Sequence, residues 1–191
     1  MITSDLFTIF QQRLTSVGGE CHEAATLEEA ANIIAVHNAL QAKEIVVPPG
    51  FSQHPRWGTI LPVLEHREIY VREAGRPADV ADAPAGLSGA ELGVAETGSV
   101  MLADNALETR IVSMLTLTHF VLVGREDLVP MLDEVGARLQ QLTRVGPEQR
   151  RYISLVTGPS RTADIERTLT IGVQGPKALC VLVVKGQGAA K

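Results

Sequence analysis

The sequence has few aromatic residues, no excess of basic residues and no long hydrophobic run, and each shortage excludes a class of protein. Aromatic residues make up 4% of the 191 residues, too few for the stacking platforms of single-strand nucleic-acid binders. The 17 Lys+Arg are outnumbered by 22 Asp+Glu, for a net charge of −5, so we expect no nucleic-acid partner. The most apolar uninterrupted run, Ala178–Val184, is far shorter than the ~20 residues that span a bilayer, so membrane insertion is not expected.

Cysteine is also scarce. Cys21 and Cys180 form neither a disulfide framework nor a Cys-x-x-Cys pair, and we expect two reduced, buried thiols in a cytoplasmic protein. The start of the chain, Met1–Asp5, lacks the features of a signal peptide. His54, His66 and His119 have no ligand-like spacing, and neighbours on a strand, such as Cys21 and His22, point to opposite faces. No metal site is therefore expected.

Hydrophobic residues make up 45% of the chain, enough for a substantial core, and the length corresponds to one domain, 1–191. Helical periodicity predicts helices over 4–17, 26–41, 128–142 and 164–170. Apolar runs between them predict strands at 20–24, 44–47, 67–72, 119–123, 152–157 and 178–184. This alternation predicts an α/β fold, a parallel sheet flanked by helices. The segment 75–89, rich in Ala, Pro and Gly, has no period and predicts a mobile connection within the domain.

The first motif that suggests chemistry follows a predicted strand that ends at Ala95, and it consists of Glu96, Thr97, Gly98 and Ser99. Gly98 permits a tight turn or the close approach of a ligand. A partly buried Glu96 could act as a base or nucleophile. The alternative is a solvated acid in a turn between two strands, and these residues alone favour it.

The second motif follows a predicted strand and leads into a predicted helix. Its polar and conformationally special residues are Gly158, Pro159, Ser160, Arg161, Thr162 and Asp164. Backbone N–H groups at a helix start, together with these hydroxyls and Arg161, suit a phosphate or carboxylate. A capped helix start without a ligand is the alternative. Asp164 either caps the helix, orients Arg161 or acts as an acid or base.

The third motif, Gly172–Pro176, predicts a constrained turn that brings Gln174 and Gly175 toward the same place, with a plain tight turn as the alternative. Ligands of parallel α/β sheets bind beyond the carboxyl ends of the strands. We therefore expect the three motif loops to converge there in one crevice. The sequence contains no G-x-G-x-x-G, Walker or G-x-S-x-G motif.

Together the three motifs resemble the LUD domain of the lactate-utilisation protein C family, and the string Gly158–Glu166 is the most specific part. The resemblance covers roughly Glu91 to Val184. It implies a fold like the NagB/RpiA/CoA-transferase group. Family members commonly have histidine in the third motif, where this chain has Gln174, and an amide cannot shuttle protons as histidine does.

The resemblance further implies a role in oxidising L-lactate to pyruvate, as a non-redox subunit or accessory protein beside iron–sulfur lactate-utilisation proteins. We expect no cofactor in this chain, because two isolated cysteines cannot supply a Cys₄ cluster site, and we expect the iron–sulfur clusters in the partner subunits. A small anionic metabolite is a further expected partner, and a homo-oligomer is left open.

A looser likeness supports an alternative function. Glu96 before Thr97 and Gly98 is similar to the Ser-Glu-Asn-Gly loop of some CoA-transferases, in which the glutamate attacks a thioester. The alternative is a stand-alone enzyme that handles a CoA ester or a phosphorylated metabolite with Glu96 as nucleophile. The asparagine of that loop is absent here.

Overall fold

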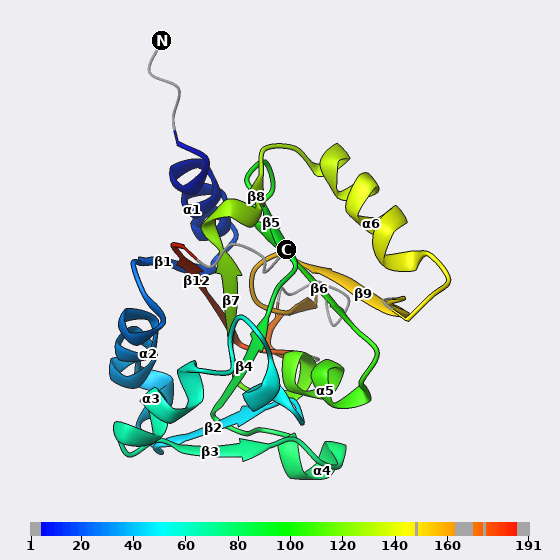
Figure 1. Ribbon diagram of the computed structural model, residues 1–191. Helices are drawn as coiled ribbons and strands as arrows, with labels where there is room; N and C mark the ends of the chain where they lie inside the picture. Colours follow the sequence, from blue (N-terminus) through cyan, green and yellow to red (C-terminus); the bar gives the residue numbers. More distant parts are fainter. Residues whose placement is uncertain (1–4, 148, 163–169, 174, 187–191) are drawn as a thin grey trace.

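The computed structural model describes residues 5–147, 149–162, 170–173 and 175–186. Within these residues, six parallel strands form a sheet in the order β1-β12-β7-β4-β2-β3 (Figure 1). Their bounds are β1 Glu20–Ala24, β2 Glu44–Val47, β3 Tyr70–Glu73, β4 Ala85–Gly89, β7 Thr118–Gly124 and β12 Ala178–Val184. The predicted α/β class with a parallel sheet is confirmed.

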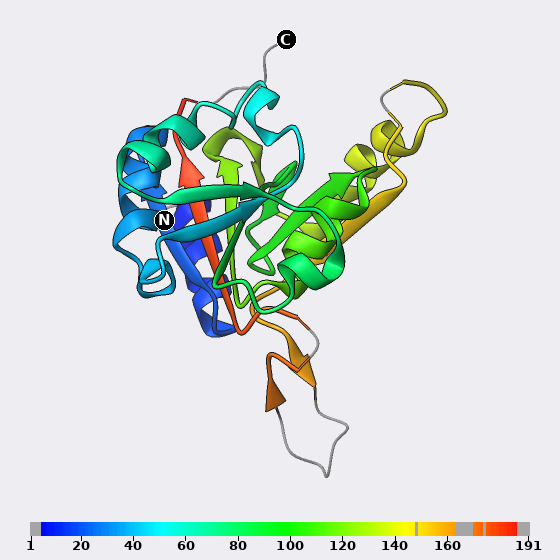
Figure 2. The same ribbon diagram turned by 90° about the horizontal axis from the view of Figure 1, so that it is seen from below.

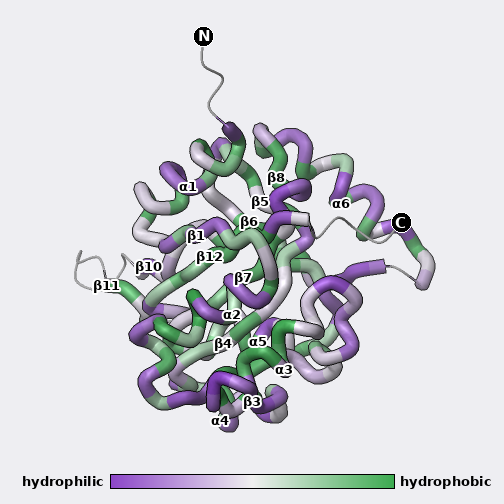
Figure 3. The backbone as a smooth tube through the Cα atoms, turned by 60° about the vertical axis from the view of Figure 1, so that its left-hand side comes forward, coloured by the Kyte–Doolittle hydropathy of each residue, from purple (hydrophilic) through white to green (hydrophobic). Residues whose placement is uncertain are grey.

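Helices cover both faces of this sheet. Their bounds are α1 Leu6–Ser16, α2 Leu27–Val36, α3 Ile60–His66, α4 Pro77–Val80 and α5 Leu107–Leu115. A further helix, α6 Val135–Thr143, packs elsewhere. Alternate residues of β7 point to opposite faces: Phe120 and Leu122 pack with α2 and α3, whereas Val121 and Val123 pack with α1. Figure 3 shows the hydrophobic β12 enclosed by helices whose outer segments are hydrophilic. No helix of the described part of the chain is long and apolar enough to cross a membrane.

A second, smaller sheet has the strand order β8-β5-β6-β9. Its strands are β5 Leu92–Val94, β6 Ser99–Asp104, β8 Leu128–Val129 and β9 Tyr152–Val156. Helix α6 packs on it through Val135 and Leu142, against Leu92 and Met101. Beyond β9, the short strands β10 Arg161–Thr162 and β11 Thr170–Ile171 pair antiparallel, and Figure 2 shows this ribbon extending away from both sheets.

The segment 75–89, predicted as a mobile connection without periodicity, contains α4 and β4, and β4 lies between β7 and β2. The glycines of β4 are the reason that the sequence did not indicate a strand there. A Cβ added to Gly86 would lie 2.8 Å from the side chain of Thr116, and one added to Gly89 would lie 2.4 Å from the ring of Trp57. Glycine is therefore required by close packing rather than by a turn.

Several predicted elements have different bounds. The helix predicted over 128–142 begins only at Val135, because Leu128 and Val129 pair as β8 with Gly93 and Val94. The second predicted helix ends at Val36 rather than near 41, and the strand predicted at 67–72 begins at Tyr70. The helix predicted over 164–170 lies largely outside the described residues, and its last residue belongs to β11.

Candidate functional site

A crevice of about 350 Å³ lies where β2 and β4 end. Pro48 follows the last residue of β2, and Gly89 is the last residue of β4. Trp57 and Arg138 of α6 also line the crevice, which therefore lies between the two sheets. This is the position in which ligands bind to open parallel sheets. It is the strongest candidate for a ligand site on geometric grounds.

His54 contributes a hydrogen-bond donor to this crevice. Its Nδ1 accepts the backbone N–H groups of Arg56 at 3.2 Å and Trp57 at 3.3 Å, so in the neutral ring Nε2 carries the proton. Burial, and then the positive charge of Arg56, lower the pKa of His54. Near pH 7 the ring is therefore neutral, and its Nε2–H is available to an acceptor.

Arg56 contributes a positive charge held in place from several sides. Its Nη2 lies 3.0 Å from Glu126 and 2.7 Å from Asp127, the second and third residues after the carboxyl end of β7. Its guanidinium carbon lies 4.7 Å from the centre of the Trp57 ring. Its Nε is buried and has no acceptor among the described residues. A buried N–H donor without a partner is costly, and a ligand oxygen would satisfy it.

The acidic side chains of the crevice are already occupied by protein donors. Glu91 pairs with Nη2 of Arg138 at 2.5 Å. Asp104 accepts the hydroxyl of Thr109 at 2.6 Å and the backbone N–H of Ala106 at 3.1 Å, just before α5 begins. These carboxylates position the arginine and the helix. The arrangement suits a small anion better than a cation.

The crevice continues into a second hollow of about 470 Å³, which shares Arg56, Glu91 and Arg138 and is bounded by α6.

The sequence alone did not indicate His54, Arg56 or Arg138 as site residues. His54 and Arg56 lie in a stretch without clear periodicity, and Arg138 occupies the polar side of an amphipathic helix. Only the position of Pro48, directly after a predicted strand, is a signal of the kind that sequence can supply.

The first and second motif loops are joined by hydroxyl groups. Thr97 Oγ1 lies 2.7 Å from Ser99 Oγ, which lies 2.6 Å from Thr157 Oγ1. Gly98 has φ +67° and adjoins α1 so closely that a Cβ would lie 2.3 Å from the backbone nitrogen of Leu14. The turn is therefore held by its contacts with α1 and with Thr157, the residue after β9.

Glu96, the predicted base or nucleophile, is exposed. One of its carboxylate oxygens accepts the backbone N–H of Leu132 at 2.9 Å, at the start of the 3₁₀ turn that precedes α6. Through this contact the Glu96 side chain caps the start of the helical segment. Its assignment as a nucleophile stays a prediction.

The second and third motif loops also meet. The backbone N–H of Ser160 donates to the carbonyl of Pro176 at 2.9 Å, and a Cβ on Gly175 would lie 2.8 Å from that of Ser160. Together with Gly158 and Pro159 they line a hollow of about 250 Å³ whose wall includes the fully buried His119.

The expectation that these loops lie beyond the carboxyl ends of the parallel strands is wrong. Pro176 lies just before β12 begins, and Gly158 adjoins Val17, just before β1 begins. The loops are thus at the amino-terminal edge of the sheet. The reason is that the strand leading into the second motif, β9, belongs to the other sheet and runs antiparallel to β6.

The remaining predicted residues are placed as follows. Arg161 donates from Nη2 to the backbone carbonyl of Val17 at the end of α1, and Thr162 pairs with Thr170 in the β10–β11 ribbon. This ribbon replaces the expected entry into a helix at those two residues. Asp164 and Gln174 lie outside the described residues.

Comparison with known proteins adds the family. The profile of the LUD domain family matches residues 8–184. Lactate utilization protein C of Anoxybacillus flavithermus is 26% identical over 190 residues, covering 95% of this chain and 81% of that protein. Lactate utilization protein C of Bacillus licheniformis is 35% identical over 100 residues, 52% of this chain and 42% of that protein. The match therefore spans less than half of the Bacillus licheniformis protein.

A solved structure shows the same fold. The crystal structure of a DUF162 family protein from Deinococcus radiodurans superposes with a TM-score of 0.62 at 22% identity, covering 96% of this chain and 99% of that one. The agreement extends over nearly the whole of both chains.

Proposed function

Because this chain belongs to the LUD domain family, we propose that it serves in lactate utilisation by binding a small carboxylate metabolite in the crevice at the ends of β2 and β4. The names of the relatives support the lactate role. The observation that supports binding is the buried Nε–H of Arg56, which has no acceptor among the described residues. L-Lactate and pyruvate are carboxylates, and a carboxylate is the acceptor that a guanidinium binds best.

The crevice supplies two kinds of donor for such an anion. Arg56 and Arg138 provide charge, and each is oriented by carboxylates. The neutral ring of His54 provides an Nε2–H, whose tautomer two backbone N–H groups fix. Trp57 is 1% exposed and stacks against Arg56, which keeps water from one side of the guanidinium. A charge-assisted hydrogen bond is stronger in such a setting than in open water.

We infer that this chain is a non-redox subunit and that iron–sulfur partner proteins hold the redox centres. Its own cysteines do not fit a cluster: Cys21 packs with α1 on one face of the sheet, and Cys180 packs with α2 and α3 on the other. A Cys₄ site needs thiolates that converge. Copurification of iron–sulfur proteins with the tagged chain from its native host supports this inference, and isolation of the chain without them contradicts it.

Titration calorimetry with L-lactate and with pyruvate tests the binding site. Arg138→Gln is the first variant, because its side chain is 42% exposed and the helix needs no such charge to form. His54→Phe is the second. Loss of a hydrogen bond to a charged group, ~1.5–3 kcal/mol, corresponds to roughly 10–100-fold weaker binding.

Arg67→Gln is the matched control, since Arg67 also pairs with an acidic side chain, Glu28, but lies outside the crevice. We expect this variant to bind as tightly as the wild type. Equal affinity of the wild type and both crevice variants for the two acids, or no binding of either acid by the wild type, contradicts the proposal.

A further inference from the structure

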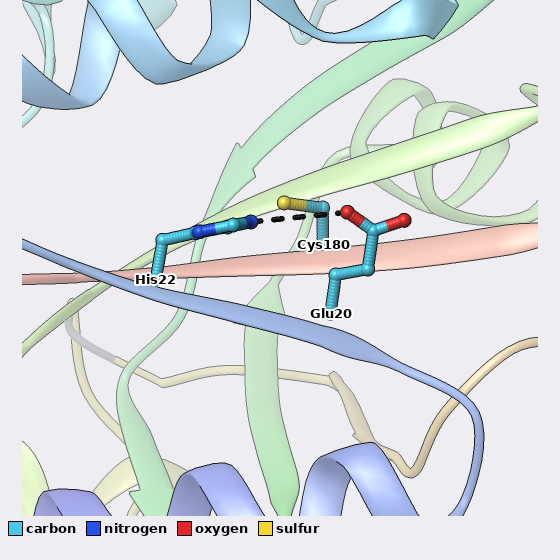
Figure 4. Close-up of side chains that lie close together, drawn as sticks. All are labelled: Glu20, His22 and Cys180. Carbon is cyan, nitrogen blue, oxygen red and sulfur yellow. Dashed lines mark ion pairs between the residues drawn. The ribbon is translucent and has the colours of Figure 1, made fainter.

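Three side chains capable of binding a metal meet where β1 lies beside β12, outside the crevice described above. Glu20 and His22 are alternate residues of β1 and therefore share one face, and Glu20 is in register with Cys180 of β12. One ligand atom of each residue lies within 4.8 Å of those of the other two. Figure 4 shows the imidazole of His22 and the carboxylate of Glu20 on either side of the Cys180 sulfur, with His22 Nε2 and Glu20 Oε2 3.8 Å apart.

We propose that Glu20, His22 and Cys180 form a zinc site that links the edge strand β1 to β12. A thiolate, an imidazole and a carboxylate are the three ligand types that Zn²⁺ accepts, and three protein ligands leave a fourth position for water. In a tetrahedral zinc site the ligand atoms lie about 3.3–3.6 Å apart. The observed spacing needs a contraction of only about 1 Å, which falls within the reach of side-chain rotation.

The burial of the three residues agrees with a site that is open on one side. Cys180 is 1% exposed, whereas the side chains of His22 and Glu20 are 43% and 51% exposed. The sulfur thus forms the floor and the other two ligands form the rim. The metal enters from solvent, and the exposed rim leaves room for the fourth ligand, a water molecule.

His37 supports this arrangement without being a ligand. Its Nδ1 accepts the backbone N–H of Ala39 at 3.1 Å, so its proton is on Nε2. That Nε2 lies 3.2 Å from Oε2 of Glu20 and donates to it. The ring is held edge-on against Phe120, with ring centres 5.0 Å apart. His37 is therefore a positioning residue that orients the carboxylate, as the outer partners of metal ligands do.

The test uses the full chain, stripped with a chelator, kept reduced and titrated with Zn²⁺ and with Co²⁺. We expect one Zn²⁺ per chain and, with Co²⁺, a thiolate-to-cobalt charge-transfer band in the near ultraviolet. His22→Asn changes a half-exposed side chain, so it should leave the fold intact and weaken Zn²⁺ binding at least tenfold. His66→Asn, which changes an exposed histidine at the end of α3, should bind Zn²⁺ as the wild type does.

The cysteines provide a second matched pair. Cys21 and Cys180 are both buried, but Cys21 points to the other face of β1. The cobalt band should disappear in Cys180→Ser and persist in Cys21→Ser. In His37→Phe the band should persist while affinity falls roughly 10–100-fold. The proposal is overturned if no saturable one-to-one binding occurs, if His22→Asn binds as tightly as the wild type, or if the band depends on Cys21.

Discussion

Acidification should destabilise this protein through one residue, His119. The side chain is fully buried in β7, its Nε2 lies 2.8 Å from Ser88 Oγ, and its Nδ1 has no partner among the described residues. Burial lowers the pKa of His119 to about 4, from an ordinary value of 6.5. The folded protein therefore holds a neutral ring over a pH range in which the unfolded chain would take up a proton.

The sign and size of the effect follow from this difference in pKa. Between pH 6.5 and about 4 the unfolded state binds more protons at this residue, so stability falls as the pH falls. Above pH 6.5 His119 makes its full contribution to the free energy of unfolding, and below about pH 4 no further stability is lost through this residue. At ~1.4 kcal/mol per pH unit, the loss across this window amounts to about 3.5 kcal/mol, a large part of a typical domain's stability.

Urea unfolding at several values between pH 7 and pH 4.5 measures this loss. His119→Gln removes the titrating side chain. The difference in free energy of unfolding between the wild type and this variant should therefore narrow as the pH falls, because all other titrating groups are the same in both proteins. His66→Gln, at an exposed histidine, should follow the wild type. The reasoning would be refuted if the difference in free energy of unfolding between the wild type and His119→Gln stayed constant from pH 7 to pH 4.5.

Three substitutions test local features. Thr26→Ala removes the side chain that accepts the N–H of Glu29 at 3.1 Å, and should lower the free energy of unfolding in urea by about 1 kcal/mol; an unchanged value would show that the cap is idle. Gly98→Ala places a Cβ against the backbone of α1 at φ +67°, and should cost at least ~2 kcal/mol in the same assay, so wild-type stability would contradict the packing. Glu96→Gln retains an acceptor for the backbone N–H that it caps, and should stay within ~1 kcal/mol of the wild type; if Glu96 is instead a nucleophile, hydroxylamine trapping with CoA thioesters labels the wild type and not this variant.

The parts of the fold that were predictable are those in which the cause is local. Runs such as Glu44–Val47 and Ala178–Val184 form strands because their own side chains fit a buried sheet, and both are strands with these bounds. The cap at Thr26 is likewise a matter of residues three apart. β4 was missed because Gly86 and Gly89 are dictated by Thr116 and Trp57, which are distant in the sequence.

The same distinction applies to the sites. His54 and Arg56 line the crevice, and Arg56 pairs with Glu126, which follows a different strand, β7. No spacing along the chain indicates such a contact. The cluster around Cys180 requires the register of β1 on β12. By contrast, the residues of the motif loops form a family pattern that the sequence itself displays. The position of these loops in the fold is not predictable from that pattern, because it depends on β9 belonging to the second sheet.

The central claim, that the crevice at the ends of β2 and β4 serves lactate utilisation, is tested most directly by growth. A deletion strain is complemented with the wild type, Arg138→Gln or Arg67→Gln at matched protein levels, with L-lactate as the only carbon source. We predict growth with the wild type and Arg67→Gln, and severely impaired growth with Arg138→Gln. Full growth with Arg138→Gln, or normal growth of the uncomplemented deletion strain, would contradict the claim.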